Sequence, residues 1–92
     1  MSWTVNIKKK VVRQLNKLPE NVRFSLVALI RDIEEYGPVR GNWANYGVLG
    51  KNRHHCHLKK GHPTYVAIWE VADKQIRIVE ISYAGTHERA PY

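Results

Sequence analysis

The residues best suited to chemistry gather in one short run, KNRHHCHLKK at positions 51–60. The run holds four basic residues, three histidines and the only cysteine of the chain, and it has no acidic residue. Histidine exchanges protons near neutral pH because its unperturbed pKa is about 6.5, and Arg and Lys can neutralise charge on a phosphate. The run therefore suggests a metal site, a phosphate-binding and proton-transfer face, or a solvated basic edge.

Zinc is the first alternative, because cysteine and histidine are its usual ligands. On a strand, however, His54 and Cys56 would point to one face while His55 and His57 would point to the other. One ion could not collect all four side chains, and paired ligand spacing is lacking elsewhere in the chain. We therefore expect no metal, and we expect Cys56 to pack in the core beside Leu58.

The same alternation predicts a row of charged residues on the opposite face of the strand. The predicted row consists of Lys51, Arg53, His55, His57 and Lys59. Its cations could hold phosphate oxygens, and its imidazoles could move protons during phosphodiester cleavage. The competing interpretation is a solvated face that meets an acidic partner. A second histidine close by, such as His87 in AGTHERAPY, would favour catalysis.

The elements that must position these residues follow from hydrophobic periodicity. Residues 2–8, SWTVNIK, alternate with the period of two that is typical of a strand with one buried face. Helical spacing then runs from Lys9 to Leu18, and it resumes at Pro19 until Gly37 and the following proline end it. A helical hairpin is therefore expected after the first strand.

The C-terminal half is typical of an antiparallel meander. A Gly- and Asn-rich loop at 38–50 could lead into a short strand at 46–49, and three runs rich in β-branched and aromatic residues follow. These runs cover 51–60, 63–71 and 74–83. We predict an α+β fold of order β-α-α-β-β-β, with a two-helix hairpin packed on a small twisted antiparallel sheet. We expect a single domain over 1–92.

Composition narrows the classes of partner and compartment. Fifteen basic and eight acidic residues give a formal net charge of +7, which favours nucleic acid, an acidic protein or an anionic surface as partner. No apolar run approaches the roughly 20 residues that span a bilayer, and MSWTVNIKKK is not typical of a signal peptide. We therefore expect no membrane partner. One cysteine cannot form an internal disulfide, which agrees with a reducing compartment, and we expect a cytoplasmic protein.

Aromatic residues outside the strands have two interpretations. Tyr92 could cap the core or stack on a nucleotide base, and Trp43 and Tyr46 in the loop share this ambiguity. The aromatic residues at strand spacing, of which we expect at least two in the core, are Trp3, Tyr65 and Trp69.

The order of elements in a small basic chain, together with NRHHCHLKKG, TYVAIWEV and GTHERAPY, resembles the RelE/ParE superfamily of bacterial toxin–antitoxin toxins. The resemblance covers nearly the whole chain and is nearest to the histidine-using branch similar to YafQ. In that branch a histidine-containing pair on the second strand precedes an apolar strand, and a Gly-Thr-His or Gly-Ser-His triplet precedes a terminal aromatic residue. His57, His87 and Tyr92 match those positions.

The resemblance implies a ribosome-dependent endoribonuclease that cuts mRNA in the ribosomal A site without a metal or other cofactor, and that a cognate antitoxin silences. His87 would be the leading general acid or base, and Tyr92 would stack on or position a nucleotide. His55 or His57 could assist proton transfer, and Arg53 would bind phosphate. Further candidates for binding RNA or phosphate are Lys51, Lys59, Lys60, Arg77 and Arg89.

The chain departs from the superfamily pattern at two points. Many RelE-like members carry arginine after the tyrosine that opens the third strand, whereas Val66 follows Tyr65 here, so Arg53 or Arg77 would have to supply that charge. Members similar to YafQ also have an acidic residue shortly after the strand-two histidine, where this chain has two lysines and a glycine.

Two other functions are compatible with the same fold. ParE-type members inhibit DNA gyrase and are not known as ribonucleases, and a noncatalytic RNA- or ribosome-binding module would also use positive charge and exposed aromatic rings. The histidines favour the nuclease, because an inhibitor surface has no evident need for side chains that titrate near neutral pH.

Overall fold

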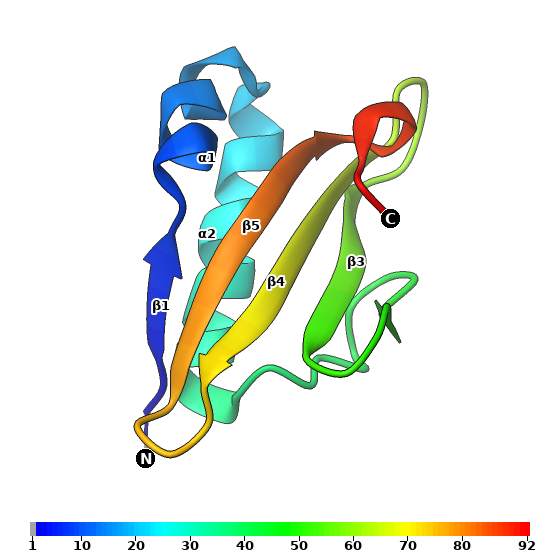
Figure 1. Ribbon diagram of the computed structural model, residues 1–92. Helices are drawn as coiled ribbons and strands as arrows, with labels where there is room; N and C mark the ends of the chain where they lie inside the picture. Colours follow the sequence, from blue (N-terminus) through cyan, green and yellow to red (C-terminus); the bar gives the residue numbers. More distant parts are fainter. Residues whose placement is uncertain (1) are drawn as a thin grey trace.

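The computed structural model describes residues 2–92, in which five strands and two α-helices follow one another in the order β1, α1, α2, β2, β3, β4, β5 (Figure 1). The strands are β1 (Thr4–Ile7), β2 (Gly47–Val48), β3 (Arg53–Lys59), β4 (Tyr65–Asp73) and β5 (Ile78–Thr86). The helices are α1 (Lys9–Gln14), which continues as the 3₁₀ turn η1 (Leu15–Lys17), α2 (Glu20–Tyr36), and a last 3₁₀ turn, η2 (His87–Arg89). The predicted α+β fold of order β-α-α-β-β-β is confirmed, with the short β2 inside the predicted loop.

Helix α2 begins and ends where the sequence predicts. Pro19 precedes its first residue, Glu20, whose carboxylate lies at the positive end of the helix dipole. Gly37 ends the helix with φ of 95°, a conformation that favours glycine, and its amide donates to Ile33 O over 2.8 Å. The residues that α2 buries, at the spacing of one helical face, are Val22, Leu26, Leu29 and Ile33.

The five strands form one sheet in the order β1-β5-β4-β3-β2. β2 to β5 pair antiparallel, as a meander requires, whereas β1 runs parallel to β5. The first strand therefore differs from the purely antiparallel prediction. α1 and α2 lie between β1 and the later strands in sequence, and such a long connection is what parallel neighbours need.

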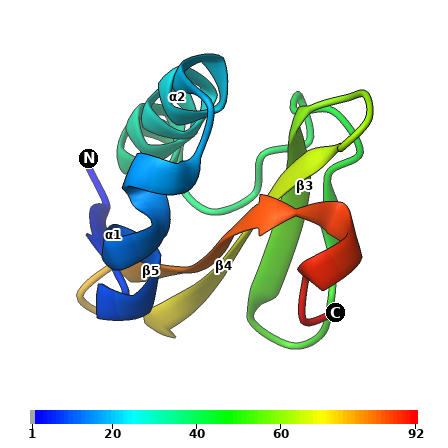
Figure 2. The ribbon, with the colours of Figure 1, turned by 90° about the horizontal axis from the view of Figure 1, so that it is seen from above.

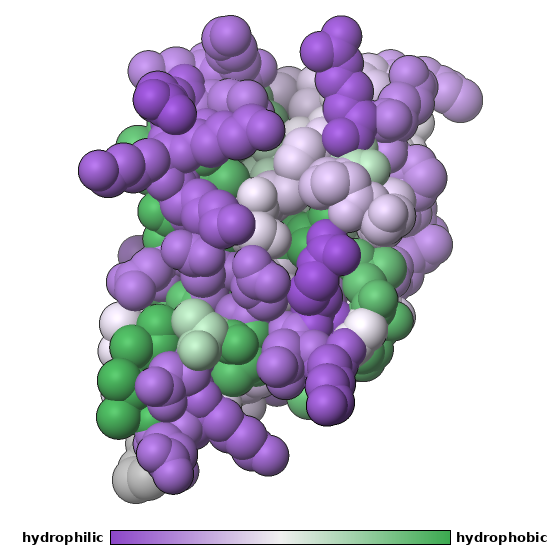
Figure 3. Space-filling model, in the orientation of Figure 1, coloured by the Kyte–Doolittle hydropathy of each residue, from purple (hydrophilic) through white to green (hydrophobic). Residues whose placement is uncertain are grey.

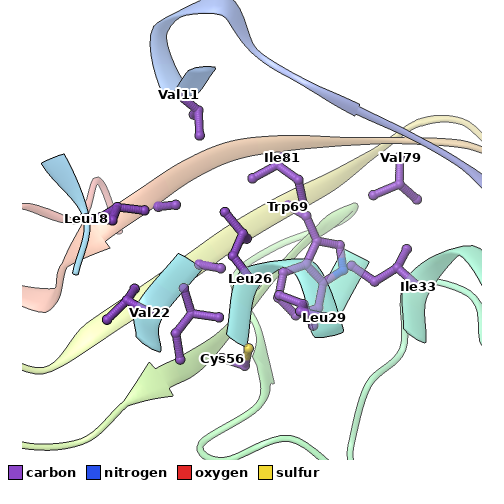
Figure 4. Packing of buried hydrophobic residues seen from close by; sticks show 13 residues of the cluster. Val11, Leu18, Val22, Leu26, Leu29, Ile33, Cys56, Trp69, Val79 and Ile81 are labelled. Carbon is purple, nitrogen blue, oxygen red and sulfur yellow. The ribbon is translucent and has the colours of Figure 1, made fainter. Parts of the chain in front are cut away.

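The main core lies between the helices and one face of the sheet. Trp69 of β4 is fully buried, and Figure 4 shows its indole between the α2 residues Leu29 and Ile33 and the β5 residues Val79 and Ile81. The indole N–H donates to Pro38 O over 2.9 Å, so the ring is buried with its polar atom satisfied. Trp3 and Tyr65 are half-buried and pack against this cluster.

A second, smaller layer covers the opposite face of the sheet. Val66 and Ile68 alternate with the core residue Trp69 along β4 and so point away from the helices, yet both are 0% exposed. In Figure 2 the chain turns back after β5, and η2 lies on the side of the sheet away from α2. The outer face of β4 is therefore apolar and buried, like the face that the helices cover.

Two of the shifts in strand bounds change where candidate residues lie. β5 begins at Ile78 and reaches Thr86, whereas the predicted run covered 74–83. Arg77 instead lies in the β4–β5 turn, with φ of 56°. β3 begins at Arg53, so Lys51 belongs to the preceding bend.

Within residues 2–92, no helix has the length and apolar character that crossing a membrane requires.

Candidate functional site

Strand β3 sorts its residues onto two faces, as predicted. His54, Cys56 and Leu58 are buried against the helices, whereas Arg53, His55 and His57 are half-buried on the outer face. Cys56 is 0% exposed, and burial raises the pKa of its thiol to about 12. The prediction that Cys56 is a core residue is confirmed.

His54 is a structural residue of the inner face. Its Nδ1 lies 2.7 Å from the Tyr46 hydroxyl, and its ring stacks on Trp69 with centroids 5.8 Å apart and an interplanar angle of 9°. Burial lowers the pKa of His54, so its neutral form is favoured. The loop residue Trp43 is structural as well, because its indole N–H donates to Asp32 Oδ2 over 2.9 Å. Of the two interpretations of Trp43 and Tyr46, the structure therefore favours packing over stacking on a nucleotide base.

On the outer face, the end of β5 brings His87 to His57. The two ring centroids are 5.8 Å apart and the rings are nearly perpendicular, at 81°. The His87 amide donates to Thr64 O over 2.8 Å, which fixes the start of η2 against the β3–β4 loop. Residues thirty positions apart thus meet because β4 lies between β3 and β5 in the sheet.

Tyr92 completes a cluster of four rings on this face. Its ring centroid lies 5.5 Å from that of His55 and 5.2 Å from that of His87. The Arg53 guanidinium donates through Nη2 to Pro91 O over 2.9 Å and so ties the tail to β3. Tyr92 remains 50% exposed, which leaves part of its ring available for stacking.

The environment favours the neutral form of two histidines in the cluster. Burial lowers the pKa of His55, and the nearby His87 lowers it further. Burial also lowers the pKa of His57, with further contributions from His87, Lys60 and His55. The Nδ1 atoms of His55 and His57 are both buried without a hydrogen-bond partner among residues 2–92. A neutral imidazole can accept a proton, as a general base must.

Two glycines let side chains approach closely around the cluster. A Cβ at Gly47 of β2 would lie 2.7 Å from His55 Nε2, and a Cβ at Gly85 of β5 would lie 2.8 Å from the Tyr83 hydroxyl. That hydroxyl donates to Thr86 O over 2.7 Å. Burial raises the pKa of Tyr83, and its hydrogen bond to Thr86 together with the Arg89 charge offsets part of the rise.

Of the five further candidates for binding phosphate, two lie near the cluster. Lys60 is close enough for its charge to lower the pKa of His57, and Arg89 belongs to the same turn as His87. Lys51, in the bend before β3, lies at the other end of that strand from His57. Arg77 lies before the nine residues of β5, which span roughly 30 Å, so it is far from His87.

Lys59 leaves the predicted row because of a β-bulge. His57 pairs with Val66, but the register then shifts, and Lys59 pairs with Tyr65. Paired residues share a face of the sheet, and Tyr65 packs against the helix-side core. The structure therefore brings together Arg53, His55 and His57 of the predicted row, but neither Lys51 nor Lys59.

Several residues around the site were absent from the sequence prediction. Glu88 follows His87 in η2 and lines a pocket beside His57, and Ala44 O accepts a hydrogen bond of 2.8 Å from the His57 amide. A groove lined by residues from the end of α1 through η1, from β4 and β5, and from η2 includes both Lys17 and Arg89. Helix α1 and η1 form a second basic surface, apart from β3. The sequence could have indicated this surface, because no acidic residue precedes Glu20. The exposed cations of α1 and η1 are Lys9, Lys10, Arg13 and Lys17.

Residues 2–92 contain no group of three His, Cys, Asp or Glu side chains placed to hold a metal ion. The site combines two imidazoles whose neutral form is favoured, His55 and His57, with the groups of His87, Arg53 and the half-exposed Tyr92. Figure 3, which views the face of the sheet opposite α2, shows mainly hydrophilic side chains, with a less polar area beside the C-terminal turn. This set can bind a phosphodiester and move protons.

Comparison with known proteins gives structural matches only. No family model matches the chain, and no curated protein matches its sequence. Among solved structures, the isolated RelE toxin of E. coli matches with a TM-score of 0.72 and 15% identity, over 98% of this chain and 89% of that one. The RelE–RelB complex of Pyrococcus horikoshii OT3 matches with a TM-score of 0.67 and 26% identity, over 98% and 100%.

A third match is the toxin–antitoxin complex RelBE2 of Mycobacterium tuberculosis, with a TM-score of 0.68 and 20% identity, over 94% of this chain and 99% of that one. The chain therefore has the fold of the RelE toxins, and these structures support the resemblance to the RelE/ParE superfamily. None of them bears on the branch similar to YafQ.

Proposed function

We propose that this chain is a single-domain toxin of a toxin–antitoxin system, spanning residues 1–92, that cleaves mRNA on the ribosome in the cytoplasm. One observation carries the proposal: His57 and His87, thirty residues apart in sequence, meet with ring centroids 5.8 Å apart. The Tyr92 ring contacts His87, and Arg53 holds the neighbouring Pro91. The fold shared with RelE toxins, some of them solved as complexes with an antitoxin, supports a cognate antitoxin as partner.

The reaction that suits these groups is a transesterification within the RNA. His57, which burial and neighbouring charges favour in the neutral form, removes the proton of a ribose 2′-OH, and the 2′-oxygen attacks the adjacent phosphorus. The bond from phosphorus to the 5′-oxygen then breaks, and His87 gives that oxygen a proton. The products are a 2′,3′-cyclic phosphate and a 5′-OH end. Each proton transfer contributes on the order of 10²- to 10⁴-fold.

The neighbouring residues bind and align the RNA. Arg53 uses one N–H, on Nη2, to donate to Pro91 O, so its remaining N–H groups can hold nonbridging oxygens and stabilise the charge that builds in the transition state. His55 and Tyr92 are in edge-to-face contact, and Tyr92 offers its exposed side to a base. Lys60, Arg89 and the basic surface of α1 and η1 supply further contacts to RNA, and the ribosome aligns the nucleotides in line.

Two assays on the purified protein separate the candidate functions. Primer extension on mRNA that is being translated in vitro should reveal discrete cuts, and gyrase supercoiling in parallel should be unaffected. Gyrase inhibition without cuts would indicate a ParE-type function and overturn the proposal. Salt-sensitive ribosome binding that leaves the message intact would indicate a noncatalytic binding module, and it would also overturn the proposal.

A further inference from the structure

A pocket of about 290 Å³ opens directly beside the His57–His87 pair. It is lined by residues 61–64 of the β3–β4 loop, by His57 of β3, and by His87 and Glu88 of η2. The volume is at the lower limit of small-molecule sites, which suits a single planar ring system better than a larger ligand.

The walls of this pocket are fixed to one another by hydrogen bonds. Thr64 Oγ1 donates to Gly61 O over 2.9 Å and accepts from the Gly61 amide at 3.3 Å, which closes the loop on itself. The loop is joined to η2 because the His87 amide donates to Thr64 O over 2.8 Å. The pocket is therefore formed before any ligand binds, which reduces the cost of binding.

Glu88 is the unexpected member of the lining. It is an exposed carboxylate next to a site that we expect to bind phosphate, in a chain of net charge +7. Among residues 2–92, the ion pairs join Lys8 to Glu70 and to Glu80, and none of them involves Glu88. A carboxylate repels phosphate but accepts hydrogen bonds from N–H donors. The ligand group that suits this pocket is therefore the base of a nucleotide and not its phosphate.

We propose that this pocket binds the base of a nucleotide next to the scissile phosphate and that Glu88 selects guanine. Guanine presents two adjacent donors, N1–H and the 2-amino group, which match the two oxygens of a carboxylate. Uracil presents one N–H between two carbonyl oxygens that the carboxylate would repel. Single-stranded bases are commonly recognised along this edge, and His62 on the rim offers a ring for stacking.

This inference rests on the proposed function, because the base can reach the pocket only if the phosphate attached to its nucleotide lies at His57 and His87. The expected size follows from carboxylate recognition of a base edge: a well-formed bidentate pair discriminates against the wrong base by roughly 10- to 100-fold.

Binding of the four ribonucleoside 5′-monophosphates tests the pocket without any cleavage. They share one phosphate and one ribose, so differences between them report on the base. Titration of the ¹⁵N-labelled protein, followed by the amide NMR shifts of residues 61, 62, 64, 87 and 88, should give a dissociation constant for GMP at least about 10-fold below that for UMP. Glu88→Gln should remove most of this preference. The matched control is Glu35→Gln, an exposed acidic residue of α2 on the other side of the sheet, which should leave the preference unchanged.

Equal affinity for the four nucleotides, shifts confined to other parts of the chain, or a guanine preference retained by Glu88→Gln would overturn the inference. The proposed function is tested separately, by mapping cuts in translated mRNA. Selective GMP binding without cuts would leave the pocket in place and refute the nuclease. Cuts whose sequence preference is the same in Glu88→Gln as in the wild type would support the nuclease and refute the role of Glu88.

Discussion

Replacing Gly47 by alanine should displace a site histidine without touching the reacting groups. The backbone of Gly47 has an ordinary φ, but the new Cβ would lie 2.7 Å from His55 Nε2, whereas ordinary contacts begin at 3.4 Å. The His55 ring must therefore move by about 0.7 Å, the difference between these distances. A misplacement near 1 Å can cost on the order of 10²-fold in rate, so we expect mRNA cleavage to slow by roughly 10- to 100-fold.

The assay is single-turnover cleavage of a ribosome-bound message, with Gly50→Ala as the matched control. Gly50 lies in the same loop region, and a Cβ there would meet no atom within 4 Å. Urea titration should give nearly equal unfolding midpoints for both variants, because the displaced atoms belong to the end of a side chain. If Gly47→Ala cleaved as fast as Gly50→Ala while NMR showed that the His55 ring had moved, His55 would have no part in catalysis.

Three further predictions concern stability and reactivity. Tyr46→Phe leaves His54 Nδ1 without its partner at 2.7 Å, so urea unfolding should show a loss of about 1–3 kcal/mol; an unchanged free energy would mean that this hydrogen bond contributes nothing. The pKa values of His54, His55 and His57 are all lowered, so below about pH 6.5 the unfolded chain binds more protons than the folded chain. The free energy of unfolding should therefore fall as pH drops from 7.5 to 5.5, and a flat profile would contradict these shifts. Cys56, with its pKa raised to about 12, should resist iodoacetamide at pH 8 in the folded protein and react fully in urea, whereas rapid labelling without urea would contradict its burial.

Periodicity predicted the architecture because each long element buries one continuous face. The alternation along β3 correctly separated His54 and Cys56 from His55 and His57. It failed at Lys59 because a bulge depends on how β3 pairs with β4, and nothing in the local sequence encodes that register. The predicted place of Arg77 was wrong for a related reason: the β4–β5 turn uses residues whose composition also suits a strand.

The candidate site was harder to predict, because it depends on contacts between distant segments. A meander places β3 and β5 on either side of β4, so the sequence allowed His87 to return to His57, and the structure has that contact. The burial of Val66 and Ile68 on the outer face could not be read from β4, which is apolar on both faces. The pocket at Glu88 likewise exists only because η2 bonds to the β3–β4 loop.

The most direct test of the central claim is the rate at which ribosome-bound mRNA is cut by His57→Ala and His87→Ala. The control is Gln75→Ala, an exposed position in the β4–β5 turn at the far end of the sheet. If His57 and His87 transfer the protons, each histidine variant should lose on the order of 10²- to 10⁴-fold in rate and the control should keep the wild-type rate. The wild-type products should carry 2′,3′-cyclic phosphate and 5′-OH ends. Cleavage at the wild-type rate by either folded histidine variant would contradict the assignment of proton transfer to this pair.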